Sequence, residues 1–160
     1  MPDTRLDIDD VDLETLVLAR NDVHPDGDWW FDVRTGDSLY LGLDDDQDLP
    51  QLANGAHVVI PRVPQPREDI DDFLASDELA ALGQDVVVRL QEAYRGRGGR
   101  RRFRDVVART AAAEAWGRFV LAREGGRAIE WLIERGLVDE APARRRQQEL
   151  WAGTGAGSAR

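Results

Sequence analysis

The chain has 160 residues and a mass of 17.9 kDa, and its 42% hydrophobic content is too high for a disordered chain and sufficient for a compact core. It has no cysteine, which excludes disulfides and cysteine-ligated metals and agrees with a reducing compartment. Neither a signal peptide nor a membrane-spanning stretch is recognisable, so we expect a cytoplasmic protein without a membrane partner.

The net charge of −10 is distributed unevenly along the chain. Residues 1–80 include 21 acidic and 5 basic residues, whereas residues 81–160 include 10 acidic and 16 basic ones, and all of these basic residues are arginine. Charge segregation of this kind informs on partners rather than on fold. We therefore expect a protein partner or self-association, with nucleic acid as an alternative partner.

The first half of the chain predicts a short helix and a small sheet. Aspartates precede apolar residues at helical spacing near residues 10–20, which is typical of a helix start. Residues 29–41 predict a β-hairpin, because two runs of β-forming residues flank a turn in which Gly36 should have a positive φ. A third strand is expected from His57 to Pro61, giving a three-stranded antiparallel sheet.

From residue 67 onward the hydrophobic period becomes helical. Ile70, Phe73 and Leu74 share one helical face. Ser76 then caps a longer helix that should run to Tyr94, with an apolar stripe made of Leu79, Leu82, Val86 and Leu90. Glycines between Gly96 and Gly99 end that helix, and a further helix contains Phe103, Val106 and Val107.

The last long helix contains Trp116 and Trp131, which lie about four turns apart and should share one buried face. Gly125 and Gly126 predict a kink or break within it, and Gly136 ends it as a C-cap. The fold class expected is α+β, with residues 1–138 as a single domain whose helical C-terminal half packs on one face of the sheet. Residues 139–160 are expected to be a partly disordered extension.

Several of these motifs resemble the bacterial uncharacterised protein family numbered 0158, over roughly residues 28–138. The matching positions are Asp32 and Gly36 in the hairpin, Asp72 and Phe73 at a helix start, Gly96, Gly98, Phe103 and Asp105 in the centre, and Trp116 and Trp131 in the last helix. The sequence departs from the family pattern at Arg100, Gly117 and Val120. The resemblance implies structural roles for the matching residues and does not specify an activity.

The central segment is the strongest candidate for a binding site. It contains six arginines within ten residues: Arg95, Arg97, Arg100, Arg101, Arg102 and Arg104. One interpretation is that these guanidinium groups pair with the acidic N-terminal half, with Phe103 in the core. The other is that they bind an anion or a nucleic-acid backbone, with Phe103 stacking on a base.

The sequence supports a metal site or a catalytic site less than it supports a binding role for the arginine-rich segment. The aspartate runs at residues 7–12 and 44–48 lack the glycine and glutamate of a calcium loop, so we interpret them as helix caps or solvated surface. His24 and His57 lack zinc-ligand spacing, and His57 fits a strand. No nucleophile, phosphate-loop or zinc-protease motif is present, and no metal or cofactor is expected.

The sequence thus favours a small non-enzymatic interaction or regulatory protein. A nucleic-acid-binding module that uses residues 95–104 is the first alternative. A hydrolase built on Asp and Glu side chains is the second, although no pair of carboxylates stands out.

Overall fold

The computed structural model describes residues 4–24, 26–42 and 55–154. The chain is α+β and divides into two compact units. Residues 1–65 and 124–160 form one, which we call the sheet unit, and residues 66–123 form the other, which we call the helical unit. We expected a single domain over residues 1–138, and the two units of the structure each have buried residues of their own.

The sheet unit begins with two short helices whose starts are set by aspartates. A 3-10 helix, η1 (Ile8–Asp10), follows Asp7, whose side chain accepts a hydrogen bond from the Asp9 N–H at 2.9 Å. Helix α1 (Leu13–Asn21) follows Asp12, which accepts from the Thr15 N–H at 3.2 Å. The aspartates at residues 7 and 12 thus act as caps, as the sequence predicted. The run at residues 44–48 lies outside the described residues.

The sheet consists of β1 (Gly27–Asp32), β2 (Ser38–Gly42) and β3 (His57–Val59) in the order β2-β1-β3, with both pairings antiparallel. Asp32 sets the hairpin turn, because its side chain accepts from the Arg34 N–H at 2.8 Å and its carbonyl accepts from the Gly36 N–H at 2.9 Å. Gly36 has φ +81°, and a Cβ there would lie 2.5 Å from the Asp10 carbonyl oxygen. The predicted positive φ is confirmed.

One face of this sheet packs on the C-terminal part of α7 (Ala113–Glu134). Phe31 of β1 is fully buried and meets Trp131 edge-on, with ring centroids 6.0 Å apart. On the other face, Trp30 stands directly opposite Leu39 and Val59, and the last two are exposed. The sheet unit therefore has an apolar interior and a partly open apolar row on its outer side.

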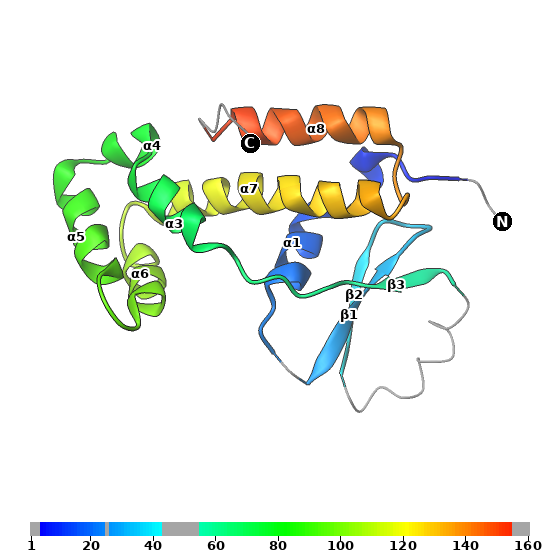
Figure 1. Cartoon of the computed structure of the whole chain (residues 1–160), viewed down its shortest axis with the longest axis horizontal. Helices are drawn as coiled ribbons and strands as arrows, with labels where there is room; N and C mark the ends of the chain where they lie inside the picture. The colour runs from blue at the N-terminus through cyan, green and yellow to red at the C-terminus, as the bar shows by residue number, and fades with distance from the viewer. Residues whose placement is uncertain (1–3, 25, 43–54, 155–160) are drawn as a thin grey trace. The chain divides into compact units, whose positions relative to one another are not determined.

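Helix α8 (Glu140–Ala152) runs alongside α7 within the sheet unit (Figure 1). Gly125 and Gly126 make this approach close, since a Cβ on Gly126 would lie 2.0 Å from Nε1 of Trp151. These glycines were expected to cause a kink or a break, and there is no break, because α7 is continuous from Ala113 to Glu134. The glycine pair instead provides a contact surface for α8.

The extension expected at residues 139–160 is also corrected. Residues 140–152 form α8, and Ala143 and Gln147 are buried. Just before α8, Val138 forms a parallel bridge with Leu6, supported by hydrogen bonds from Leu6 N–H to the Leu137 carbonyl and from Asp139 N–H to the Leu6 carbonyl, each 3.0 Å. The segment after Gly136, whose φ is +66°, is thus part of the sheet unit.

The helical unit contains α3 (Arg67–Leu74), α4 (Asp77–Ala80), α5 (Gln84–Tyr94), α6 (Gly99–Val107) and residues 113–123 of α7. Ser76 caps α4 as predicted, accepting from the Leu79 N–H at 3.2 Å. The single helix expected from Ser76 to Tyr94 is wrong, because Gly83, at φ +110°, separates α4 from α5. As a result Leu82 is exposed and Val87 takes a core position.

Aromatic rings form the centre of the helical unit. Phe73 lies with its centroid 5.0 Å from Trp116 and 5.3 Å from Phe119, and Phe103 lies 5.0 Å from Trp116. Phe73 and Phe103 are fully buried. The helices of residues 66–123 therefore have a core of their own. Trp116 and Trp131, expected on one buried face, belong to two separate cores.

Candidate functional site

The arginine-rich segment joins α5 to α6 through a loop that requires glycine. Gly96 and Gly98 have φ values of +76° and +74°, a region that side-chain-bearing residues rarely adopt. Gly99 opens α6 so close to the preceding helix that a Cβ would lie 1.9 Å from the Tyr94 carbonyl oxygen. The backbone of residues 95–99 is therefore held in one compact turn, and its arginines project from a fixed base.

Arg102 maintains this turn. Its guanidinium group donates hydrogen bonds to the backbone carbonyls of Ala93 (3.1 Å) and Arg97 (2.6 Å), and also to that of Arg95. Ala93 lies in the last turn of α5, and Arg95 and Arg97 follow it, where helical partners run out. Arg102 is thus a structural residue of the loop, and each of its three guanidinium nitrogens donates to a backbone carbonyl.

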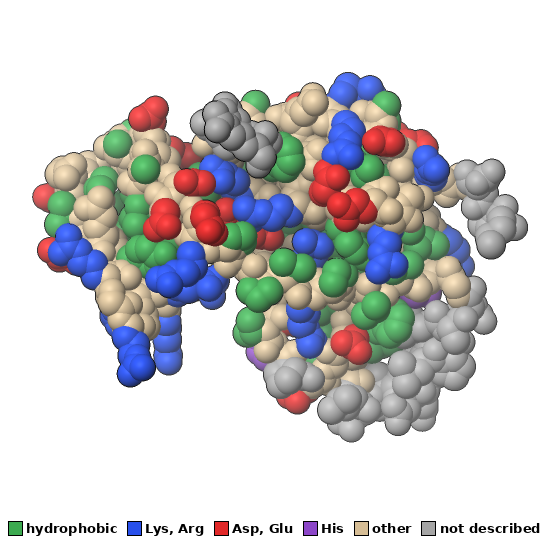
Figure 2. All heavy atoms as spheres, viewed as in Figure 1, with side chains coloured by type: hydrophobic (Ala, Val, Ile, Leu, Met, Phe, Trp, Pro, Cys, Tyr) green, Lys and Arg blue, Asp and Glu red, His purple; other side chains and the backbone are tan. Residues whose placement is uncertain are grey.

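The other arginines of the segment differ from Arg102. Arg95, Arg97, Arg101 and Arg104 are exposed, and within the described ranges they form no ion pair with a carboxylate. Arg100 is half-buried. Basic side chains project from the part of the molecule formed by α5 and α6 (Figure 2). The segment presents positive charge to solvent on a rigid turn.

Acidic residues of the same unit pair with other arginines. On α7, Arg123 contacts Asp72 of α3 at 2.8 Å and buried Asp69 at 3.8 Å, and its guanidinium lies 4.9 Å from the ring centre of Phe119. Arg118 contacts Glu78 of α4 at 2.6 Å. Hydrogen bonding to Glu78 is the main cause of the raised pKa of Arg118. The pairing between acidic and basic parts that we considered for residues 95–104 is made here by α7.

Phe103 lies in the core between Tyr94 and Trp116, with ring centroids 6.1 and 5.0 Å away. It is fully buried, so the interpretation in which it stacks on a base is wrong. Asp105, two residues later, is exposed. Any contact that the segment makes with a polyanion would therefore use guanidinium groups and backbone N–H groups, without an aromatic platform.

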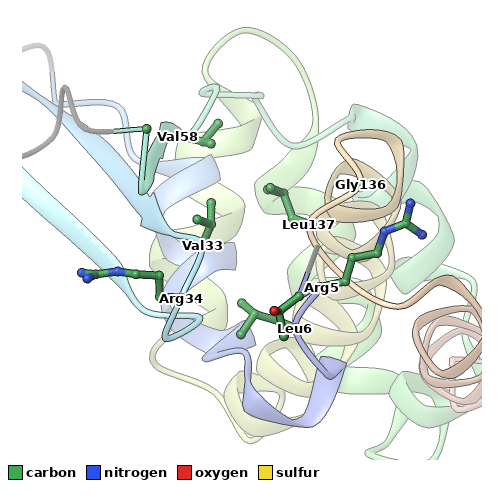
Figure 3. Close-up of a pocket in the computed structure, with 9 residues that line it drawn as sticks. Arg5, Leu6, Val33, Arg34, Val58, Gly136 and Leu137 are labelled. Carbon is green, nitrogen blue, oxygen red and sulfur yellow. The ribbon is translucent and has the colours of Figure 1, made fainter. Parts of the chain in front are cut away.

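A cavity of about 590 Å³ lies in the sheet unit beside the β1–β2 turn (Figure 3). Apolar side chains of Leu6, Val33 and Leu137 face it, while Arg5 and Arg34 extend away on opposite sides. The guanidinium group of Arg34 forms an ion pair with the Asp32 carboxylate at 3.4 Å. Burial disfavours ionisation of Asp32, but hydrogen bonds from the backbone and side chain of Arg34 outweigh it and lower the pKa of Asp32. The cavity is thus mainly apolar.

A polar cluster that the sequence did not suggest lies where α1, α7 and α8 meet in the sheet unit. Glu124 is 1% exposed and bonds to Arg127 at 2.5 Å. Buried Gln147 donates from Nε2 to the Gly126 carbonyl and to Glu130, both at 2.9 Å. Hydrogen bonds from Arg144 and then from Gln147 lower the pKa of Glu130. The only hint in the sequence is charged residues at helical spacing between Glu124 and Glu134, which resembles an exposed face.

The two histidines lie in different segments of the sheet unit, His57 in β3 and His24 after α1. His57 is a β3 residue, as predicted, and its Nε2 lies 3.6 Å from Asp32. His24 is exposed and bonds to Asp22 at 2.6 Å. Among the described residues no three His, Asp or Glu side chains are grouped as a metal site would need. Within the same residues no helix has the length and apolar character to cross a membrane.

Comparison with protein-family models, with curated proteins and with solved structures gives no match to this chain. The resemblance to the family numbered 0158 therefore stays a prediction, and the function must be argued from the residues themselves.

Proposed function

We propose that this protein is a non-enzymatic, cytoplasmic binding protein whose arginine-rich segment contacts the phosphate backbone of a nucleic acid. The observation that carries the proposal is the glycine turn between α5 and α6 together with α6, on which Arg95, Arg97, Arg101 and Arg104 are exposed without carboxylate partners among the described residues. Guanidinium groups bind phosphate in two-pronged geometry, and several of them on one surface give a salt-dependent, sequence-independent attraction.

Phosphate contact without base recognition agrees with the position of Phe103. Since that ring is buried, the segment lacks the stacking element that single-strand binders use. Affinity should accordingly depend on the number of phosphates contacted and differ little between sequences. The overall charge of −10 opposes long-range approach, so we expect binding that is measurable at low salt and weak at physiological salt.

A second candidate is an interaction protein that recognises an acidic protein surface through the same residues. The charge division favours it: the helical unit has 11 arginines and 10 acidic residues, while the sheet unit has 10 arginines and 21 acidic residues. A second copy of the chain could supply the acidic surface, so this candidate includes self-association.

The test is a salt titration of binding to fluorescently labelled duplex DNA and single-stranded RNA. The variant Arg101→Ala with Arg104→Ala should weaken binding and reduce the slope of log affinity against log salt by about 0.9 per lost contact on duplex DNA. Arg135→Ala with Arg145→Ala is the matched control, because it removes two exposed arginines that lie outside the segment.

Equal weakening by both double variants would mean that only net charge matters, and it would overturn the proposal. Failure to bind either nucleic acid at low salt would do the same. Tighter binding to polyglutamate than to nucleic acid, or dimerisation that the segment variant abolishes, would support the second candidate instead.

A further inference from the structure

A second cavity, of about 600 Å³, lies in the sheet unit and adjoins the polar cluster. Its wall combines residues from four segments: Arg20 of α1, Pro61 and Val63 after β3, Arg127 and Trp131 of α7, and Trp151 of α8. The Val63 N–H donates to the Arg20 carbonyl at 2.7 Å, which holds the segment after β3 against α1. The cavity is therefore part of the packed unit and is formed by distant parts of the chain.

Two buried donors in this wall have no acceptor. Arg20 is 6% exposed and Trp131 is 8% exposed, and neither Nε of Arg20 nor Nε1 of Trp131 has a hydrogen-bond partner. Buried N–H groups are almost always satisfied, and an unsatisfied one destabilises the fold. Both atoms are enclosed by the surrounding protein, so a ligand in the cavity would meet buried Arg20 through the terminal nitrogens of its guanidinium group.

The charges around Arg20 favour an anionic acceptor. Burial lowers the pKa of Arg20, Glu124 opposes that shift, and Arg127 adds to it. Glu124 is bonded to Arg127, and Glu130 is bonded to Arg144 and Gln147, so these carboxylates have partners of their own. Arg20 forms no ion pair with a described carboxylate. Glu134, an exposed wall residue, attracts Arg20 and would disfavour highly charged anions.

The rest of the wall is suited to a flat apolar group. Trp131 and Trp151 provide aromatic surface, and Pro61 and Val63 provide aliphatic surface. Aromatic walls with a few convergent polar donors are typical of small-molecule sites. We propose that this cavity binds a small aromatic carboxylate, whose carboxylate accepts hydrogen bonds from the terminal nitrogens of Arg20 while its ring packs on the tryptophans.

The experiment uses the full chain and three probes of matched design, followed by calorimetry and by the indole N–H signals in a two-dimensional NMR spectrum. Benzoate has both the ring and the charge, benzamide has the ring without the charge, and inorganic phosphate has charge without a ring. Benzoate should bind saturably and shift the Trp131 indole signal, and the other two should bind about tenfold more weakly or worse.

The variants test the Arg20 guanidinium and the aromatic wall separately. Arg20→Met, which keeps an apolar stem, should weaken benzoate binding about tenfold or more, whereas Arg135→Met, at an exposed position just after the helix that contains Trp131, should leave it unchanged. Should Arg20→Met fail to fold, Trp131→Phe decides, since it keeps a smaller ring beside Phe31 and should weaken benzoate binding by reducing the aromatic wall. Unchanged benzoate affinity in the folded variant would overturn the proposal. So would equal binding of all three probes, or no saturable binding of benzoate, which would mean that the cavity holds only water.

Discussion

The two units differ in where they place most of their charge. The helical unit keeps most of its arginines at the surface, where Arg118 pairs with Glu78 and the residues of the α5–α6 turn remain exposed, and its half-buried Arg123 contacts buried Asp69. The sheet unit, although more acidic overall, buries Arg20, Glu124 and Gln147 in its interior. Exposed charge of one sign suits a large, loosely held partner, whereas buried charge with unmet donors suits a small enclosed ligand. The surface composition of a region therefore indicates little about its binding chemistry until burial is known.

The largest expected effect concerns whether each unit has a core of its own. Phe73→Ala removes a fully buried ring from the helical unit and should lower the free energy of unfolding by about 3–5 kcal/mol. Leu82→Ala, at an exposed position of the same unit, should change it by less than about 0.5 kcal/mol. Amide hydrogen exchange should show the protection loss concentrated in residues 66–123. A uniform loss that includes β1 and α8 equally would show a single cooperative body.

Two glycines of α7 have different surroundings, so the same substitution can be compared at both positions of one helix. Gly126→Ala places a methyl group against the Trp151 ring and should destabilise the chain by about 1–3 kcal/mol, despite the better helix propensity of alanine. Gly117→Ala has open space around it and should stabilise by up to about 1 kcal/mol. Chemical denaturation of both variants provides the measurement. A stabilising Gly126→Ala would contradict the close packing of α8 on α7.

Within the arginine-rich segment, the structure predicts different effects for neighbouring residues. Arg102→Ala removes three hydrogen bonds to the turn and should lower the free energy of unfolding by about 1 kcal/mol, whereas Arg101→Ala should change it by less than about 0.5 kcal/mol. Under the interpretation in which the segment pairs with the acidic half, both substitutions would destabilise the fold by losing carboxylate partners. Thermal or chemical unfolding distinguishes these outcomes, and equal losses would support the pairing interpretation.

The smallest effect concerns pH. Because Arg144 and Gln147 lower the pKa of Glu130 in the folded chain, the unfolded chain binds this proton more readily. The stabilisation from Glu130 should be complete above its ordinary value of 4.5 and be lost as the pH falls through the lowered value. Glu130→Gln should therefore flatten the fall in stability on the acid side. An unchanged pH profile would show that the ion pair contributes nothing measurable.

Local chemistry made much of the fold predictable. The aspartate and serine caps, the positive φ of Gly36 and the three strands each depend on residues close in sequence, and the structure has all of them. Gly83 was missed because one glycine within an apolar stripe looks compatible with a continuous helix. Gly125 and Gly126 were misread for the opposite reason: their role depends on Leu150 and Trp151, which come later in the chain.

Prediction of the candidate sites was limited in the same way, because it depends on which distant residues the fold brings together. The arginine-rich segment is contiguous and could be found in the sequence, although nothing there separated Arg102, which donates to the backbone, from Arg101, which is exposed. The cavity beside Arg20 could not be found, since its wall joins α1, the segment after β3, α7 and α8. Burial depends on how the unit is folded, so the sequence does not distinguish a buried arginine from an exposed one.

The connectivity of the two units sets an order for biosynthesis. The helical unit is one uninterrupted stretch, residues 66–123, whereas the sheet unit needs both the chain before residue 66 and the chain after residue 123. As the chain leaves the ribosome, β1 to β3 emerge first but lack Trp131, Val138 and α8, so Phe31 is without the tryptophan ring that packs on it. The helical unit can assemble its aromatic core before those residues are made. The first strands synthesised are then among the last to be completed, and a nascent chain stalled before residue 124 would expose them to chaperones.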